Sequence, residues 1–264
     1  MRGGAGRIGL LAATGGVLVF LYVPIIIIGL YAFNGDRGQS WPIANWTVKW
    51  FGAALDNQSL HDAIVLSLQA ALGATIIAMV LGTLAALAVH RFAFFGRETV
   101  SFILLLPIAL PGIVTGMALN ATFNTFSIPF TLFTIIAGHA TFCVVTVYNN
   151  AIARMRRSSR SIEEASMDLG ADTATTFRRV TLPVLRTALV AGGLLAFALS
   201  FDEVIVTTFT AGTQQTVPIW ILSNLRLPNQ RPIVNVVALV LILLSLIPVY
   251  LAQRMTRDTS GSGR

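Results

Sequence analysis

Charge is scarce in this sequence: Asp, Glu, Lys and Arg make up 11% of its 264 residues, against roughly 25% in an average soluble domain. Hydrophobic residues account for 55%, and the mean hydropathy is +0.76. A soluble globular class is excluded, because so few charges cannot cover a water-exposed surface. The composition predicts an all-α protein that crosses a membrane several times.

Lysine, cysteine and histidine are also nearly absent. Lys49 is the only lysine and follows Val48, so a phosphate-binding P-loop, which needs a lysine after glycine, is excluded. The single cysteine, Cys143, rules out an internal disulfide. His139 lies in an apolar run and is interpreted as a hydrogen-bonded group between helices. The histidines show no metal-site spacing and no nucleophile–base pair, so we expect no metal, no cofactor bound by this chain and no enzyme.

Long apolar runs are abundant and predict six membrane spans, since about 20 apolar residues cross the hydrocarbon layer. The runs are Ile8–Gly35, Ala63–Val89, two within Thr99–Ala153 separated by a turn at Asn124–Pro129, Pro183–Ala211 and Ile233–Gln253. The first run exceeds the apolar core of a signal peptide and no cleavage pattern follows, so we expect it to be retained. The whole chain, residues 1–264, is predicted to be one transmembrane domain.

The distribution of basic residues predicts the orientation. If the N-terminus is cytoplasmic, 14 of the 18 basic residues fall in inner segments, and the outer ones are Arg37, Lys49, Arg226 and Arg231. This asymmetry satisfies the positive-inside rule, so both termini are expected inside. The net charge of +7 is then explained without nucleic acid.

Tryptophans mark the outer segments. Trp41, Trp46 and Trp50 suit either the lipid headgroup level or a docking surface, and the sequence leaves both open. Trp220, in the second outer segment, is a candidate for the mouth of a cavity.

The inner segment Arg154–Leu182 is too long for a simple turn and predicts two short helices. Ser161 and Glu164 have capping-box spacing at the start of the first, and Gly170 can end it. The second is expected at about Thr173–Val180, just before the fifth span. These ordering signals favour a compact knob on which a partner docks.

One motif covers this knob. Its residues are Glu164-Ala165-Ser166, three residues, Gly170, nine residues, and Val180-Thr181-Leu182-Pro183. The pattern resembles the EAA motif of ABC importer permeases, which is Glu-Ala-Ala, three residues, Gly, nine residues, Ile, any residue, Leu-Pro. Ser166 and Val180 are conservative departures from it.

The resemblance implies a type I ABC importer permease in a bacterial inner membrane, with a coupling helix that inserts into a separate ATPase subunit. ATP and Mg²⁺ would bind two such ATPase subunits. The other implied partners are a second, different permease chain and an extracytoplasmic substrate-binding protein, besides membrane lipid. Phe177 and Arg178 are candidates for contacts with an apolar pocket and acidic groups of the ATPase.

The segments Tyr31–Asn34 and Phe201–Glu203 resemble the permeases of spermidine/putrescine-type importers. The resemblance implies polyamine or another small organic cation as the solute. Related permeases take ferric iron, thiamine or phosphonates, and these remain alternatives. Those relatives are expected to carry an acidic residue after the proline at Pro111, where this chain has Gly112, a departure that counts against a cationic solute.

Two carboxylates, Asp202 and Glu203, lie in the predicted fifth span. A carboxylate in a span is costly and usually faces a water-filled cavity or a partner. On a continuous helix from Pro183, Asp202 would lie roughly 28 Å along the axis, toward the outside. Adjacent residues point about 100° apart, so one carboxylate is expected to face the solute path while the other caps, kinks or pairs. Phe201 is included with them as a candidate path residue.

In the predicted third span, Pro107 and Pro111 each remove an amide donor, so we expect a broken gate helix there. Gly112 and Gly116 form a small-residue pair that lets helices approach closely. A stand-alone secondary transporter is the alternative from another class, but the repeated broken helices typical of such proteins are not found in the sequence.

Overall fold

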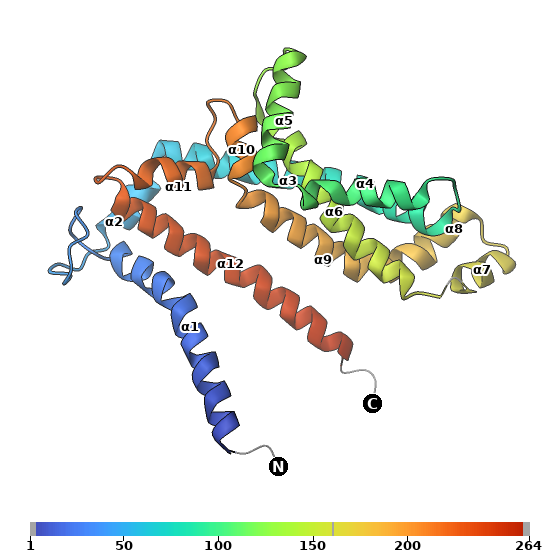
Figure 1. The fold of residues 1–264 in the computed structure, drawn as a ribbon, viewed down its shortest axis with the longest axis horizontal. Coiled ribbons are helices and arrows are strands. Elements are labelled where there is room, and N and C mark those ends of the chain that lie inside the picture. Colours follow the sequence, from blue (N-terminus) through green and yellow to red (C-terminus); the bar gives the residue numbers. More distant parts are fainter. Residues whose placement is uncertain (1–3, 160, 261–264) are drawn as a thin grey trace. The chain divides into compact units, whose positions relative to one another are not determined.

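A computed structural model describes residues 4–159 and 161–260, and over these residues the chain is helical, with one isolated antiparallel bridge between Asn34 and Trp46. The helices in chain order (Figure 1) are α1 (Gly4–Ala32), α2 (Lys49–Leu55), α3 (Gln58–Arg91), α4 (Arg97–Ala109), α5 (Gly112–Thr125), α6 (Leu132–Arg156), α7 (Ser161–Asp168), α8 (Thr173–Thr176), the π-helix η1 (Phe177–Thr181), α9 (Leu182–Phe201), α10 (Ile205–Thr210), α11 (Val217–Leu225) and α12 (Arg231–Ser260).

The chain divides into two compact units. Unit 1 comprises residues 1–61 and 220–264, and unit 2 comprises residues 62–219. Both α3 and α11 run across the boundary between them.

The predicted spans coincide with long apolar helices. Four of them are long and apolar enough to cross a membrane: Gly6–Ala32, Gln58–Arg91, Leu132–Arg156 and Thr173–Phe201. The bent pair α4 and α5 is long and apolar enough only when the two helices are taken together, and the predicted sixth span falls on α12, whose residues Arg231–Ser245 form a shorter apolar helix. The expected turn between the third and fourth spans lies between α5 and α6.

Unit 1 packs α1 and α2 against α12. The segment after α1 is folded back by two backbone hydrogen bonds, Gly35 N to Asn45 O at 2.7 Å and Thr47 N to Phe33 O at 2.8 Å. Trp50 is buried, and its Nε1 donates to Asn34 O at 2.8 Å. Trp41 and Trp46 are 72% and 62% exposed. The headgroup or docking interpretation therefore applies to these two tryptophans, whereas Trp50 belongs to the core of the loop.

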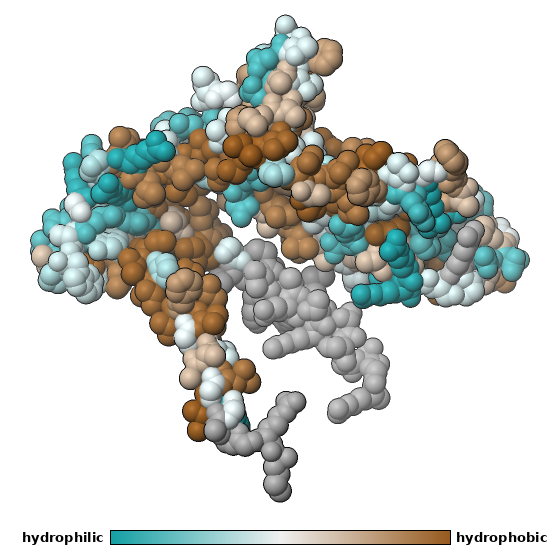
Figure 2. Space-filling model, in the orientation of Figure 1, coloured by the Kyte–Doolittle hydropathy of each residue, from teal (hydrophilic) through white to brown (hydrophobic). Residues whose placement is uncertain are grey.

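The core of unit 2 forms where α6 packs on α9 and on the end of α3. Small residues permit the close approach: a Cβ at Gly82 would lie 2.8 Å from Val144 O, and one at Gly192 would lie 3.3 Å from Asn150 Cβ. Without interhelical hydrophobic attraction in lipid, such close van der Waals packing stabilises a helix bundle. Figure 2 shows apolar side chains over the region around α4, and hydrophilic side chains at the end that carries α7 and α8.

The predicted third span is broken at Pro111, as expected. α4 and α5 meet at 102°, with Leu110 in extended conformation and Pro111 as the N-cap of α5. The residue before a proline is pushed out of the helical region, which explains where the helix ends. The prediction was wrong for Pro107, which lies inside α4 without ending it.

The fifth span differs from the prediction in two ways. It is not continuous to Ala211, because α9 ends at Phe201 and α10 begins at Ile205. The second helix of the knob is not separate either, since α8 continues through η1 into α9 and forms one 29-residue helix, Thr173–Phe201.

Candidate functional site

The first part of the candidate site is the coupling segment, residues 161–183. α7 ends as the sequence predicted: Gly170 has φ +87°, its N–H bonds to Met167 O at 2.9 Å, and Ala171 N bonds to Ser166 O at 3.2 Å. This is the Schellman arrangement, in which a glycine takes the left-handed conformation at no steric cost.

α8 begins at a cap that sequence reasoning missed. Asp172 Oδ1 accepts a hydrogen bond from Thr175 N at 2.8 Å, and hydrogen bonds from Thr175 lower the pKa of the Asp172 carboxyl. The Ser166 and Thr176 hydroxyls lie 3.1 Å apart and join α7 to α8. Asp one residue before a Thr-rich stretch is an ordinary N-cap signal that could have located this helix start.

η1 joins α8 to α9 at the position of the motif's proline. Leu182 N bonds to Phe177 O, five residues back. Pro183 has no N–H, and its ring crowds the carbonyl of Arg179 four residues earlier, which the wider π turn accommodates.

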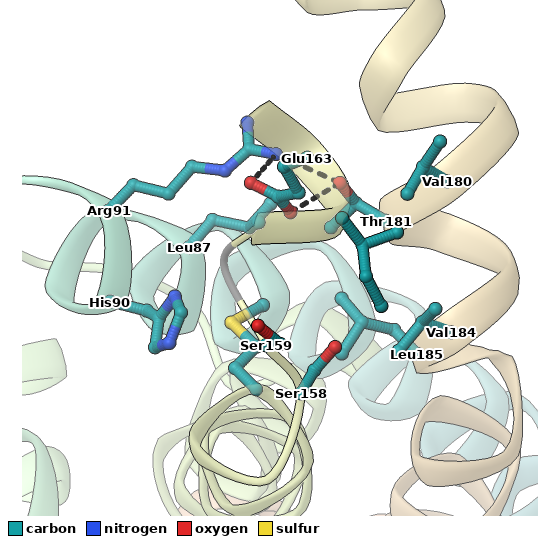
Figure 3. A pocket seen from close by; sticks show the side chains of 12 residues that line it. Leu87, His90, Arg91, Ser158, Ser159, Glu163, Val180, Thr181, Val184 and Leu185 are labelled. Carbon is teal, nitrogen blue, oxygen red and sulfur yellow. Dashed lines mark hydrogen bonds and ion pairs between the residues drawn. The ribbon is translucent and has the colours of Figure 1, made fainter. Parts of the chain in front are cut away.

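A three-residue latch holds the coupling segment onto α3 (Figure 3). Arg91 Nη2 lies 2.8 Å from Glu163 Oε2 and 2.9 Å from Thr181 Oγ1, and the Thr181 hydroxyl donates to Glu163 Oε1 at 2.6 Å. Burial would raise the pKa of Glu163, but the hydrogen bonds from Arg91 and Thr181 outweigh it, so the net pKa is lowered. Glu163 therefore stays ionised, and α3, α7 and η1 are joined at one point.

Beside the latch lies a small pocket that is open to solvent, with a cavity volume of about 20 Å³. Its walls come from the end of α3, the α6–α7 connection and the start of α9, with His90, Ser158 and Ser159 among the lining residues. The pocket lies where the coupling segment meets the long helices of unit 2.

The outer face of the coupling segment carries exposed apolar side chains: Leu169 is 90% exposed, Ile162 50% and Met167 46%. Of the predicted contact residues, those that are exposed are Glu164, Ala165, Gly170, Arg178, Leu182 and Pro183, while Ser166 and Phe177 are half-buried. A polar loop with this many exposed apolar groups is typical of a binding surface.

The second part of the candidate site is the break between α9 and α10. Glu203 Oε1 accepts from Val206 N at 2.9 Å, so this carboxylate caps α10. Asp202 follows the last residue of α9 and is exposed. Glu203 thus caps a helix and Asp202 does not, which agrees with the expectation that the two carboxylates have different roles.

The two helix breaks of unit 2 lie side by side. A Cβ at Gly112, the first residue of α5, would lie 3.6 Å from Ile205, the first residue of α10, and one at Gly116 would lie 2.6 Å from the Phe209 ring. Asn120 Nδ2 also donates to Phe209 O at 2.7 Å. The close approach predicted for Gly112 and Gly116 is confirmed, with α10 as the partner helix.

Two candidate path residues make other contacts. The ring of Phe201 stacks on Phe197, with centroids 6.0 Å apart. Trp220 is 1% exposed, and its Nε1 donates to Ser59 Oγ at 2.9 Å within unit 1. Among the described residues, no group of three or more His, Cys, Asp or Glu could hold a metal ion.

The family described as "Binding-protein-dependent transport system inner membrane component" matches residues 78–260. The chain belongs to this family. It is therefore a permease component of an ABC transport system in an inner membrane, and not an enzyme.

Two curated relatives show how far the likeness extends. The spermidine/putrescine transport system permease protein PotC of Haemophilus influenzae is 35% identical over 246 residues, which cover 92% of this chain and 95% of the relative. The putrescine transport system permease protein PotI of Escherichia coli is 34% identical over 228 residues, covering 83% and 80%.

A solved structure supports the fold. The crystal structure of a bacterial ABC transporter involved in the import of the acidic polysaccharide alginate matches with a TM-score of 0.74 over 98% of each chain, at 16% identity. The type I permease fold that the EAA-like motif implied is confirmed.

Sequence reasoning missed the latch. Arg91 and Glu163 are 72 positions apart in the chain, so no local spacing connects them.

Proposed function

We propose that this permease moves a small organic cation, most specifically a polyamine such as spermidine or putrescine, inward across the membrane. Two separate ATPase subunits supply the energy, a second permease completes the path, and an outer binding protein delivers the solute. Both termini face the cytoplasm in this arrangement, consistent with the asymmetry of the arginines. The 33–35% identity to polyamine permeases over most of the chain supports the choice of solute.

The observation that carries the proposal is the pairing of an ordered docking surface with a latch to α3. Glu164, Gly170 and the exposed apolar groups of α7 form the surface for the ATPase. The Arg91–Glu163–Thr181 latch passes the movement of α7 to the long helices, because it joins three elements at one point. Phe177 and Arg178 are assigned to contacts with an apolar pocket and acidic groups of the ATPase.

Asp202 is the group we assign to the cationic solute. Its carboxylate is exposed at the break between α9 and α10, whereas the Glu203 carboxylate already caps a helix. A carboxylate exposed at a helix break in a membrane protein is expected to face a water-filled path, since lipid would not solvate it. Pro111 places the gate helix α5 beside this break, and Phe201 lies at its edge.

The direct test uses the complex assembled from this permease, its partner permease and its ATPase in lipid nanodiscs. ATP hydrolysis is measured with the binding protein loaded in turn with spermidine, putrescine, thiamine, a phosphonate or ferric iron. We expect several-fold stimulation by the polyamines alone. Stimulation by the phosphonate and not by polyamines would contradict the assignment of Asp202.

A further inference from the structure

His139 occupies a fully buried position on α6, opposite the break in the fifth span. Its Nδ1 lies 2.7 Å from Ser200 Oγ, near the end of α9, and its Nε2 lies 2.8 Å from Thr207 Oγ1, in α10. The imidazole ring is 0% exposed. One side chain therefore reaches both sides of the break that carries Asp202.

The hydrogen bonds around the ring fix which nitrogen carries the proton. Thr207 Oγ1 donates its hydrogen to Glu203 O at 2.8 Å, so toward His139 this hydroxyl can only accept. Nε2 must then carry the hydrogen that it donates to Thr207. In the neutral ring, Nδ1 is left as an acceptor for the Ser200 hydroxyl. Each of the three hydrogen bonds in the series Ser200–His139–Thr207–Glu203 thus has one donor and one acceptor.

The break needs such support because its backbone leaves the helical pattern directly after the spanning helix Thr173–Phe201. Val204, Ile205 and Val206 are β-branched and have low helix propensity, and free backbone groups are costly at membrane depth. Glu203 satisfies the Val206 N–H through its carboxylate, and Thr207 satisfies the Glu203 carbonyl. His139 fixes the Thr207 hydroxyl that completes this pattern.

Residues of α6 near His139 also contact both α9 and α10. Thr134 Oγ1 donates to Thr210 O at 2.8 Å, and Cys143 Sγ lies 3.3 Å from Ala196 O. A Cβ at Gly138 would lie 3.0 Å from Val206 Cγ1. Thr134 and Gly138 contact α10, Cys143 contacts α9, and His139 contacts both.

We propose that His139 is a positioning residue for solute binding: its neutral imidazole bridges α9 and α10 and thereby fixes the place of Asp202 at the break. The proposal rests on the assignment of Asp202 to the cationic solute. His139 itself does not touch the solute, because it is buried behind the break. Its loss changes where Asp202 is held, and so weakens solute binding more than it slows turnover.

The variants separate the two halves of the bridge. An Asn amide overlaps the Nδ1 position of a histidine and a Gln amide reaches the Nε2 position, so His139→Asn keeps only the Ser200 contact and His139→Gln keeps the Thr207 contact. Thr207→Val removes the same hydroxyl without a change of shape, and Thr207→Ser retains it. Cys143→Ser, one turn along α6, is the matched control because it keeps its contact with Ala196.

Uptake of labelled spermidine into proteoliposomes by the complete complex gives the first readout. His139→Asn and Thr207→Val are expected to raise the KM about tenfold, the factor expected when a buried hydrogen bond of roughly 1.4 kcal/mol is lost, with the maximal rate nearly unchanged. His139→Gln also cuts the bridge, because it keeps the Thr207 contact but loses the Ser200 contact, and it should raise the KM as His139→Asn does. Thr207→Ser and Cys143→Ser should resemble the unmodified protein. A normal KM for His139→Asn, or equal loss of rate in all variants, would overturn the proposal.

A second readout needs no solute. In the complex labelled with ¹⁵N-histidine, NMR should show His139 neutral and protonated at Nε2. Hydrogen exchange of the 202–208 backbone should be slow, and at least tenfold faster in His139→Asn. A charged ring or the other tautomer would overturn the bridge. If the unmodified complex moves no polyamine while the bridge is observed, the proposed solute fails and the bridge stands.

Discussion

At the residue scale, the two adjacent acids of the fifth span have different tasks. Glu203 caps α10 through Val206 N, and Asp202 is exposed. The sequence predicted that one of the two carboxylates faces the solute path and that the other has a structural role, but not which is which. Their orientation depends on a helix break that the run of apolar residues concealed. The run of β-branched residues after Glu203 was the available signal for that break.

Exchange of Asp202 for Asn should raise the KM for spermidine by a factor of about ten or more, since a charged hydrogen bond contributes roughly 1.5–3 kcal/mol. Glu203→Gln is the matched control: its amide oxygen still accepts from Val206 N, so uptake should stay near normal. The account would be contradicted if Glu203→Gln were as impaired as Asp202→Asn in the same proteoliposome assay.

Gly170 offers a test of whether a partner covers the turn after α7. Its φ of +87° strains any other residue, at a cost of about 1 kcal/mol, yet a Cβ there meets nothing within 4 Å of this chain. Gly170→Ala and Gly170→Phe should therefore unfold at similar temperatures when the permease is alone.

In the complex, the same two variants should differ. We expect Gly170→Phe to lose ATPase binding and uptake, because the ring would enter the space of the ATPase, while Gly170→Ala loses little. Pull-down of the ATPase by each purified permease, followed by uptake, measures this. Equal binding by the two variants would mean that no partner sits at this turn.

At the element scale, the latch predicts how the coupling segment transmits movement. Arg91→Glu and Glu163→Arg should each lower the solute moved per ATP hydrolysed several-fold, because each places two like charges together at the joint. The double exchange restores the pair and should recover most of the coupling. Arg186→Glu, an exposed arginine on α9, is the charge-reversal control. If the double variant were no better than the singles, the pair would not be the transmitting contact.

The ion pair between Arg91 and Glu163 should also persist at moderately acidic pH. The pKa of Glu163 is lowered from a usual value of about 4.3, so the ion pair's contribution to stability is complete above the usual value and is lost only as pH falls through the lowered pKa. Thermal unfolding of the permease across acidic pH should show a stability loss for the unmodified protein that Glu163→Gln lacks. Identical pH profiles would contradict this reading of the ion pair.

Short sequence patterns correctly predicted the helix ends that a single residue determines. Gly170 ends α7 and Pro111 breaks the third span, because a glycine or a proline acts through its own backbone. Pro107 was misread, because it lies in the last turn of α4, two residues before the helix ends at Ala109, and there its missing N–H removes only one hydrogen bond. The Arg91–Glu163 pair and the joining of α8 to α9 depend on tertiary contacts and on a π turn, which no short pattern in the sequence specifies.

At the scale of the whole molecule, the long apolar helices and the ordered coupling segment belong to a transport component that has no P-loop lysine of its own. The fold is that of an importer permease, and the membership in the binding-protein-dependent family covers residues 78–260. We therefore propose that this chain provides the solute path and the coupling segment, and that a separate ATPase provides the energy.

The most direct test compares proteoliposomes that contain the permease pair alone with others that also contain the ATPase, each supplied with polyamine-loaded binding protein and ATP on the ATPase side. Labelled spermidine should accumulate against its gradient only with the ATPase and hydrolysable ATP present. Accumulation by the permease pair alone, without ATP, would contradict this expectation.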